Sequence, residues 1–246
     1  MAATLSKDFS FSTSFTGLYQ LQAMGTSYNP ATYPNGVAGS LEIVDGTMKA
    51  TIRQTDPPTF TGIRAEVITH INALGDEQTI TWEMMVKSDE WTEETGQIVI
   101  GQLHTEDSIA AAVGFSIEIK KAVIFFSMPK SEPPTESWNE NQIPCANLRK
   151  DVWIKMAVRM KCINNTTGYI EFFMDGKQYV KVSNRGTSYN ADAPYFKIGI
   201  YDGPHNADFG TKSVRIRNVK VWAGVGSWEE TLGQIPEHPQ RLVSAK

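Results

Sequence analysis

Cysteine and long apolar runs are both scarce in this 246-residue sequence, which has only Cys145 and Cys162. Two thiols do not build the disulfide framework of small secreted domains, and their spacing matches no zinc-ligand pattern. One bridge is allowed, but we expect two unpaired, partly buried thiols. No run is long enough to span a membrane, and the N-terminus lacks the basic and apolar stretches of a signal peptide. We expect no membrane association, and action outside a cell or on a virion.

An excess of either charge is also missing. The 23 Lys and Arg residues against 27 Asp and Glu give a net charge of −4, so no general basic field attracts nucleic acid. An acidic ligand would need a local cluster of basic side chains. Hydrophobic residues make up 41% of the chain and charged residues 20%, which indicates a globular fold and excludes intrinsic disorder.

Helical periodicity is lacking too, and alternation with a period of two takes its place. Asp45-Gly46 and Asp175-Gly176 each separate two alternating segments, which predicts two hairpins. Lys120-Lys121 is expected at another turn, and Arg217-Asn218 interrupts alternation as a bulge does. The expected strands cover residues 40–44, 47–53, 63–71, 78–86, 98–103, 113–119, 122–127, 153–162, 168–174, 177–182, 195–201 and 213–222.

This pattern predicts an all-β protein with one sandwich or barrel domain over residues 1–246. We find no internal repeat and no linker. Two Pro-containing stretches, 29–38 and 129–147, are expected to be loops, and the second is either a lid or wall beside a site or a simple connector. The tail after Gly226 is polar and is expected to pack along the sandwich.

Two strands carry polar side chains that share a face. Arg64 and Glu66 lie two residues apart and point to the same side. They form either a simple surface ion pair or an arginine held in place to bind a carboxylate. Gln102 and His104 share a face at the end of the apolar segment 98–103, either as a satisfied pair at a strand edge or as an acid/base site.

A third strand has one polar, aromatic face and one apolar face. Its rings and cation would suit a sugar-binding groove, although tyrosine and lysine are also common on an ordinary solvent-facing strand. The polar face consists of Tyr195, Lys197, Gly199 and Tyr201, and the core face of Phe196, Ile198 and Ile200.

In this order, Arg-x-Glu, Gln-x-His and Tyr-x-Lys-x-Gly-x-Tyr resemble the jelly-roll polysaccharide lyases, which include heparin lyase I and the fungal glucuronan lyases. The resemblance spans residues 40–222 and leaves an N-terminal extension (1–39) and a C-terminal tail (223–246). It implies a single β-sandwich of the jelly-roll, concanavalin A-like type. Leu103 departs from the pattern, since an aromatic residue is expected there, and this predicts a changed subsite wall.

The resemblance implies β-elimination on a uronic acid, in which a base removes the C5 proton and the C4 oxygen leaves. The site must neutralise the substrate carboxylate and supply both a base and an acid. By resemblance, Arg64 and Gln102 engage the carboxylate, and His104 is the base or helps to neutralise charge. Tyr201 or Tyr195 is the acid, with His104 and Tyr201 the strongest candidates.

Two further residues take supporting roles in this scheme. Glu66 would orient Arg64 rather than touch substrate. Lys197 would bind substrate and would help a tyrosine act as a base, because a nearby cation favours the phenolate. The scheme requires no metal and no cofactor.

Other function classes remain open at this point. A non-catalytic carbohydrate-binding protein or a protein that decorates a virion could use the same fold, and a phage-borne depolymerase would satisfy both readings. A hydrolase would need two carboxylates at suitable spacing, whereas Glu118 stands alone on its strand. The expected partner is an acidic polysaccharide, with no nucleic acid or membrane; a homo-oligomer or virion component is left open.

Overall fold

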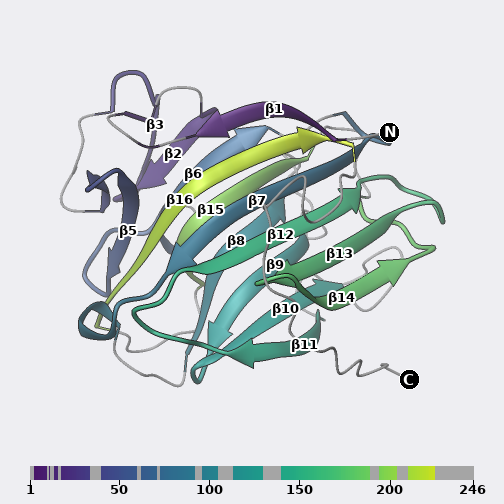
Figure 1. Ribbon diagram of the computed structural model, residues 1–246. Coiled ribbons are helices and arrows are strands. Elements are labelled where there is room, and N and C mark those ends of the chain that lie inside the picture. Colours follow the sequence, from purple (N-terminus) through teal and green to yellow (C-terminus); the bar gives the residue numbers. More distant parts are fainter. Residues whose placement is uncertain are drawn as a thin grey trace.

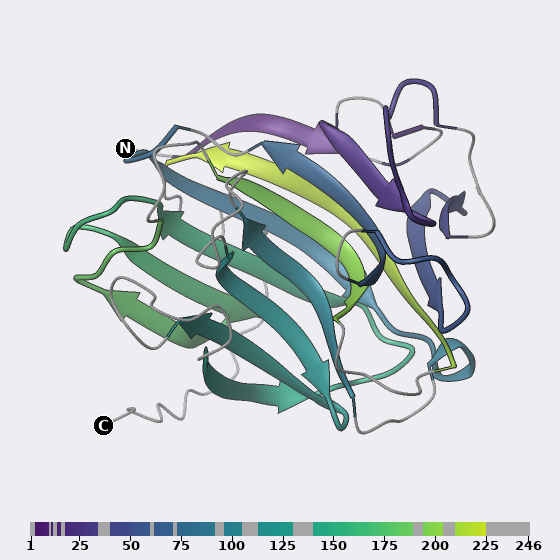
Figure 2. The same ribbon diagram turned by 180° about the vertical axis from the view of Figure 1, so that it is seen from behind.

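Two antiparallel β-sheets pack face to face in the computed structural model (Figures 1 and 2). The structure describes residues 3–9, 11, 14–15, 18–33, 40–59, 62–70, 73–91, 96–104, 113–129, 140–188, 194–203 and 210–224. Within these ranges, no helix has the length and apolar character that crossing a bilayer requires.

The first sheet has eight strands. Their order is β14 (Lys177–Ser183), β13 (Tyr169–Met174), β12 (Ile154–Lys161), β7 (Glu77–Met85), β16 (Thr211–Ala223), β5 (Thr47–Arg53) and β4 (Leu41–Val44), with β1 (Thr4–Phe9) also paired to β16. The long β16 therefore pairs with β5 along its first half and with β1 along its second.

The second sheet also has eight strands. Their order is β11 (Glu140–Asn147), β10 (Val123–Pro129), β9 (Val113–Lys120), β8 (Gln97–His104), β15 (Tyr195–Asp202), β6 (Ile63–His70), β2 (Gln20–Ala23) and β3 (Thr26–Tyr28). A short 3-10 helix, η2 (Ser88–Glu90), follows β7. The apolar segment 98–103 lies in β8, which has three strands on one side and four on the other.

Aromatic side chains link the two sheets through the core. Trp82 of the first sheet packs on Phe196 of the second, with ring centroids 5.4 Å apart. Phe172 of the first sheet packs on Phe126 of the second at the same separation. Phe115 joins these two pairs by contacting both Phe126 and Phe196. Large rings such as these dominate the apolar surface that a core removes from water, so they fix how the sheets stack.

Local sequence signals explain the hairpins. Asp45 and Gly46 both have positive φ (51° and 69°), and Asp175 and Gly176 repeat this (47° and 81°), as a two-residue turn matching the strand twist requires. Both predicted hairpins are confirmed as β4–β5 and β13–β14. The predicted bulge is confirmed, since the pairing of β16 with β7 shifts between Arg217 and Lys220.

The structure corrects several sequence expectations. The turn before β10 lies at Lys121 and Ala122, both with positive φ, and not at Lys120-Lys121. The stretch 129–147, expected to be a loop, contains the edge strand β11. No strand was predicted there because the segment contains Pro144, although proline is tolerated in an edge strand. Residues 34–38 and 130–139 of the two expected loops, and the tail after Gly226, lie outside the described residues.

The segment before residue 40 is part of both sheets. It supplies β1 to the first sheet and β2 and β3 to the second, although the sequence predicted no strand there. Cys145 and Cys162 are free, as expected. Cys162 is completely buried, and burial raises the pKa of each thiol to about 12.

Candidate active site

Three adjacent strands of the second sheet carry all the predicted site residues. In the pairing of β15 with β8, Tyr195 lies opposite His104 and Lys197 opposite Gln102. In the pairing of β15 with β6, Tyr201 lies opposite Arg64. Directly paired residues point to the same face, and the alternate residues of β15 are buried in the core. The seven predicted residues therefore share the face of this sheet that points away from the first sheet, called here the outer face.

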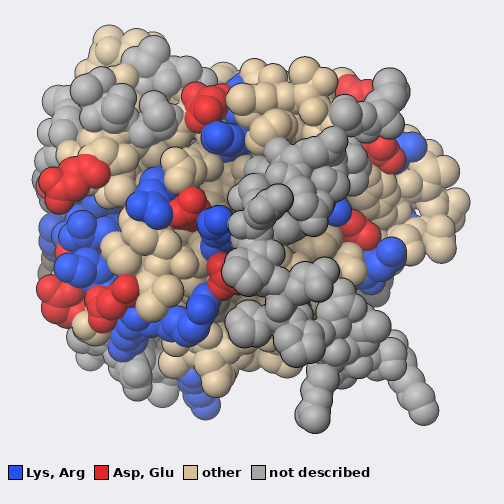
Figure 3. All heavy atoms as spheres, in the orientation of Figure 1, with Lys and Arg blue, Asp and Glu red and all other residues tan. Residues whose placement is uncertain are grey.

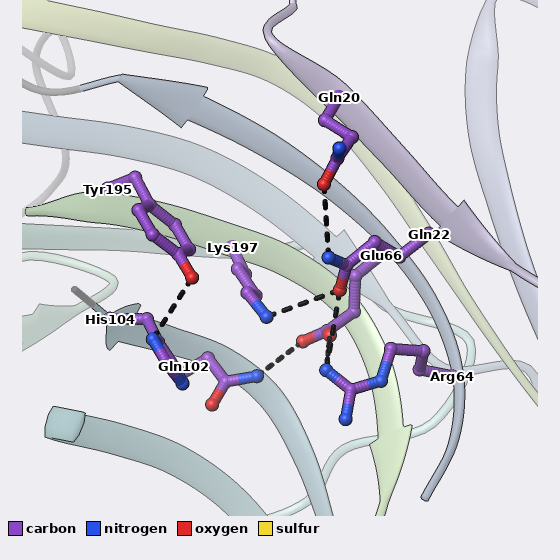
Figure 4. A network of polar contacts seen from close by, with 8 residues as sticks. All are labelled: Gln20, Gln22, Arg64, Glu66, Gln102, His104, Tyr195 and Lys197. Atoms are coloured by element: carbon purple, nitrogen blue, oxygen red, sulfur yellow. Dashed lines mark hydrogen bonds and ion pairs between the residues drawn. The ribbon is translucent and has the colours of Figure 1, made fainter. Parts of the chain in front are cut away.

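A buried carboxylate lies at the centre of this face (Figure 4). Glu66 is only 1% exposed; its Oε1 accepts a hydrogen bond from Gln102 Nε2 at 2.7 Å. Its Oε2 lies 3.4 Å from Nη1 of Arg64, which is 6% exposed. A buried charge is costly unless it is paired and hydrogen-bonded, and here both conditions are met. The contact is the one through which Glu66 would orient Arg64, and that role stays a prediction.

A second cation, Lys197, and an amide, Gln22, join Arg64, Glu66 and Gln102 in one polar cluster. Lys197 Nζ donates to Oε1 of Gln22 at 3.2 Å, and Arg64 Nη1 donates to the same oxygen at 3.3 Å. Gln22 lies on β2 directly opposite Glu66, and its Nε2 donates to Oε1 of Gln20 at 3.1 Å. The sequence reasoning missed Gln22. The only signal was the alternation of Gln20 and Gln22 with apolar neighbours, in a segment that matched no motif.

The electrostatics of the cluster favour an anion. Two cations, Arg64 and Lys197, face one carboxylate, Glu66. Burial lowers the pKa of the Lys197 ammonium to about 8; Arg64 adds to this lowering, and Glu66 opposes it. A substrate carboxylate would supply a second negative charge, so it would relieve the repulsion between the two cations.

A histidine and a tyrosine meet at one end of the cluster. The hydroxyl of Tyr195 lies 3.0 Å from Nδ1 of His104, within hydrogen-bond distance (Figure 4). Their rings stack, with centroids 5.3 Å apart and planes 18° from parallel. Both side chains are only partly buried. The Lys197 ammonium lies 5.6 Å from the centre of the Tyr195 ring. This arrangement can pass a proton between ring nitrogen and phenol.

Tyr201 lies at the other end of the polar face of β15, away from Tyr195. It is six residues further along β15 than Tyr195, which corresponds to about 20 Å of extended strand. The Arg64 guanidinium stacks over its ring at 4.2 Å. The structure thus brings His104 together with Tyr195, and Arg64 together with Tyr201.

Gly199 lets β15 approach β6 beneath Glu66. Its φ is +153°, and a Cβ atom there would lie 2.2 Å from the carbonyl oxygen of Ala65 and 2.7 Å from Cα of Glu66. These are backbone atoms that cannot turn aside. The glycine of the Tyr-x-Lys-x-Gly-x-Tyr stripe is therefore required by packing between the strands.

Leu103 does not line the outer face. It is buried in the core, on the opposite side of β8 from Gln102 and His104. The expectation that this departure changes a subsite wall is therefore wrong, because alternation along the strand directs the side chain inward.

A second buried carboxylate lies further along the outer face. Glu118 of β9 accepts hydrogen bonds from Ser116 at 2.5 Å, Ser127 at 2.9 Å and Gln142 at 3.4 Å. Ser116 lies opposite Gln102, so the two polar groups are neighbours on this face. Burial raises the pKa of Glu118, against the effect of the serine hydrogen bonds. Glu118 is alone on its strand, but it is not isolated in space.

The outer face of the first sheet differs from this arrangement. Figure 3 shows basic and acidic side chains interleaved there over the parts that it draws in colour. Ion pairs join them, including Arg217–Glu83, Arg149–Asp175 and Lys49–Glu90. Among the described residues, no three His, Cys, Asp or Glu side chains gather as a metal site.

Known proteins resemble this chain in sequence and in structure. Residues 40–220 match the family model described as polysaccharide lyase. No curated protein matches the sequence. The structure resembles an endo-β-1,4-glucuronan lyase from the fungus Trichoderma reesei with a TM-score of 0.64 at 17% identity, covering 90% of this chain and 96% of that one.

Alginate lyases give similar values. The family 7 alginate lyase A1-II′, in complex with substrate, has a TM-score of 0.67 at 14% identity, covering 85% of this chain and 94% of that one. An alginate lyase from Pseudomonas aeruginosa has a TM-score of 0.64 at 11% identity, covering 83% and 97%. At such identities these likenesses establish the fold alone, and it is the predicted all-β sandwich of the jelly-roll, concanavalin A-like type.

Proposed function

Since the chain belongs to the polysaccharide lyase family, we propose that it cleaves an acidic polysaccharide by β-elimination at a uronic acid, using the outer face of the second sheet. One observation carries the proposal: a buried Arg64–Glu66–Gln102–Lys197 cluster lies directly beside the contact between His104 and Tyr195. The solved glucuronan and alginate lyases of similar fold act on polymers of this chemical class.

The cluster answers the first difficulty of the reaction. The C5 proton of a uronic acid is weakly acidic while the adjacent carboxylate carries its charge, because removing it places a second negative charge beside the first. Arg64 offers a planar fork that matches a carboxylate, and Lys197 adds a positive charge one strand away. Both cations stabilise the enolate-like charge as it develops.

The His104–Tyr195 pair meets the second requirement of the reaction, which is proton transfer. His104 takes the C5 proton; the electron pair of that bond forms the C4–C5 double bond, and the C4–oxygen bond breaks. Tyr195 gives its hydroxyl proton to the leaving oxygen. The 3.0 Å contact then returns the proton from His104 to Tyr195, so both residues regain their starting states. In this scheme Tyr201 supports Arg64 through the stacking contact.

The first test is ultraviolet absorbance of unsaturated uronate during incubation with glucuronan, alginate, heparin, hyaluronan and capsular polysaccharides. We expect a rise with at least one polymer. We expect His104→Ala and Tyr195→Phe to reduce the rate by about 10²- to 10⁴-fold, as loss of an acid/base group does. Tyr179→Phe, on β14 of the other sheet, is the matched control and should leave the rate unchanged.

Tyr201→Phe decides between the two tyrosines. A loss with Tyr201→Phe as large as that expected for Tyr195→Phe, with full activity retained in Tyr195→Phe, would transfer the acid role to Tyr201. Absence of any rise, with binding retained, would instead favour a carbohydrate-binding or virion-decorating protein on the same fold. Either function would be exercised where acidic polysaccharides occur, outside a cell or on a particle.

A further inference from the structure

A pocket of about 330 Å³ lies at the β2–β3 edge of the second sheet. Its volume is within the range of small-molecule sites in proteins. It is formed by residues 18–20 and 27–31, all of which precede the segment 40–220 that matches the family model. The pocket therefore lies outside the segment that matches the family model.

The lining of this edge pocket is polar but uncharged. It contains no Asp, Glu, Lys, Arg or His among the residues that form it, which are Leu18, Tyr19, Gln20, Ser27, Tyr28, Asn29, Pro30 and Ala31. Another pocket of similar size, about 320 Å³, lies on the outer face of the first sheet and is lined by charged groups such as Lys49 and Glu90, which already form an ion pair. The edge pocket is therefore suited to hydroxyl groups rather than to a carboxylate.

An exposed aromatic ring borders the edge pocket. Tyr19 is 49% exposed, the most exposed of the large hydrophobic side chains among the described residues. Its backbone is fixed, because its N–H donates to the carbonyl oxygen of Ile68 on β6 at 2.9 Å. A ring held in this way is suited to stacking on the apolar face of a sugar, since it offers area at little cost in conformational entropy.

The edge pocket is joined to the candidate active site by hydrogen bonds. Gln20 lines the pocket and accepts from Gln22, which in turn accepts from Lys197 and Arg64 (Figure 4). Gln22 lies opposite Ser27, another residue of the lining, so both point to the outer face. β2 is two strands from β15, a distance of about 10 Å that a few sugar rings span.

We propose that the edge pocket is a distal subsite for the same polysaccharide, which binds a sugar ring through Tyr19 stacking and through its hydroxyl groups. This inference rests on the proposed function for the identity of the ligand. A polymer held at both places would lie across β15, β6, β2 and β3, with its reacting uronic acid at the charged cluster and a ring only a few units away at the edge pocket.

The test measures binding apart from cleavage. Affinities of glucuronan and alginate oligosaccharides of increasing length are determined by calorimetry for the full chain carrying His104→Ala, with and without Tyr19→Ala. We expect equal affinity for the shortest oligosaccharides. Beyond the length that reaches β3, Tyr19→Ala should lower affinity about tenfold, which is about 1.4 kcal/mol and the size of one aromatic contact. Tyr179→Ala controls for loss of a ring elsewhere.

Salt dependence separates this subsite from the charged cluster. The loss caused by Tyr19→Ala should be the same at low and high salt, whereas the loss caused by Lys197→Met should shrink at high salt, because only charged contacts are screened. Asn29→Ala, on the same pocket, should reproduce the length dependence with a smaller loss.

The outcomes distinguish the subsite from the proposed function. Identical length dependence with and without Tyr19, or no binding of any oligosaccharide, overturns the subsite. A length-dependent loss without any cleavage by the unmodified chain supports the subsite and refutes the lyase reaction. Circular dichroism of each variant shows whether the fold is retained, and the exposure of Tyr19 makes this the expected result.

Discussion

At the scale of single residues, Lys197 combines burial with a titration near neutral pH. It is 3% exposed and donates to Gln22. Burial lowers the pKa of its ammonium from 10.5 to about 8. The ammonium therefore keeps its charge at pH 7 but loses it in mildly alkaline solution, where an ordinary lysine would not. Loss of this charge would weaken any hold on a substrate carboxylate.

This titration predicts a pH-dependent stability. Between about pH 8 and pH 10.5 the unfolded chain keeps the Lys197 proton while the folded chain has released it. The free energy of unfolding therefore rises with pH in that window, by on the order of 3 kcal/mol in total. Urea unfolding of the unmodified protein and of Lys197→Met, at several pH values from 7 to 10.5, measures it. The difference between the two should increase with pH, and parallel profiles would contradict the assigned titration.

At the scale of elements, the four-residue strand β2 helps to position the charged cluster. It brings Gln22 opposite Glu66, where one amide oxygen accepts from both cations. Without that acceptor, Arg64 and Lys197 would repel each other across a buried space with a single carboxylate between them. The strand thus holds the charged cluster in place from outside the segment that matches the family.

Replacement of Gln22 tests this role. We expect Gln22→Leu to raise KM about tenfold with a smaller change in kcat, because the cations lose their common acceptor and position the substrate poorly. Gln22→Glu keeps an acceptor at the same place but adds the second negative charge that the cluster would otherwise take from the substrate, so it should raise KM at least as much. A purely structural contribution of β2 would instead lower the stability of both variants, leave KM unchanged and reduce the apparent kcat in proportion to the folded fraction.

The sequence predicts elements well where local chemistry determines them. Asp45-Gly46 and Asp175-Gly176 define their hairpins because both positions adopt positive φ. β1, β2 and β3 escaped prediction because no turn signal of that strength lies beside them. The shared face of Arg64 and Glu66 follows from alternation along one strand. His104 and Tyr195 are 91 residues apart in the sequence, and their contact depends on the register of β8 with β15.

At the scale of the whole molecule, the first residues stabilise the sandwich. β1 pairs with the second half of β16, from Thr4 opposite Ala223 to Phe9 opposite Val219, and the Phe9 ring is buried. The first strand of the expected N-terminal extension is therefore a structural part of the first sheet. Its removal would open a strand edge beside Val219 and Val221, and open edges pair with other chains.

Deletion of residues 1–9 should therefore lower the melting temperature by about 10 °C, since a loss of roughly 3 kcal/mol corresponds to such a shift in a chain of this length. Light scattering on heating should show earlier association than in the full chain. Differential scanning calorimetry gives the first quantity. A melting temperature unchanged within 2 °C would show that β1 contributes little to the fold.

The outer faces of the two sheets differ in how far their charged groups are buried. The net charge is −4, and ion pairs such as Arg217–Glu83 neutralise the outer face of the first sheet. The outer face of the second sheet instead buries two cations around one carboxylate. An acidic polymer would be repelled weakly at long range and attracted only at the cluster, so its association should become faster as salt increases.

The antiparallel pairing of β1 with β16 also has a mechanical consequence. Thr4 of β1 and Ala223 of β16 lie opposite each other at the same end of the ladder. A force that pulls these two residues apart loads one hydrogen-bonded pair at a time. The two strands therefore separate pair by pair instead of being loaded in shear. If these two residues were drawn apart, β1 would therefore detach at low force before the other strands carried any load.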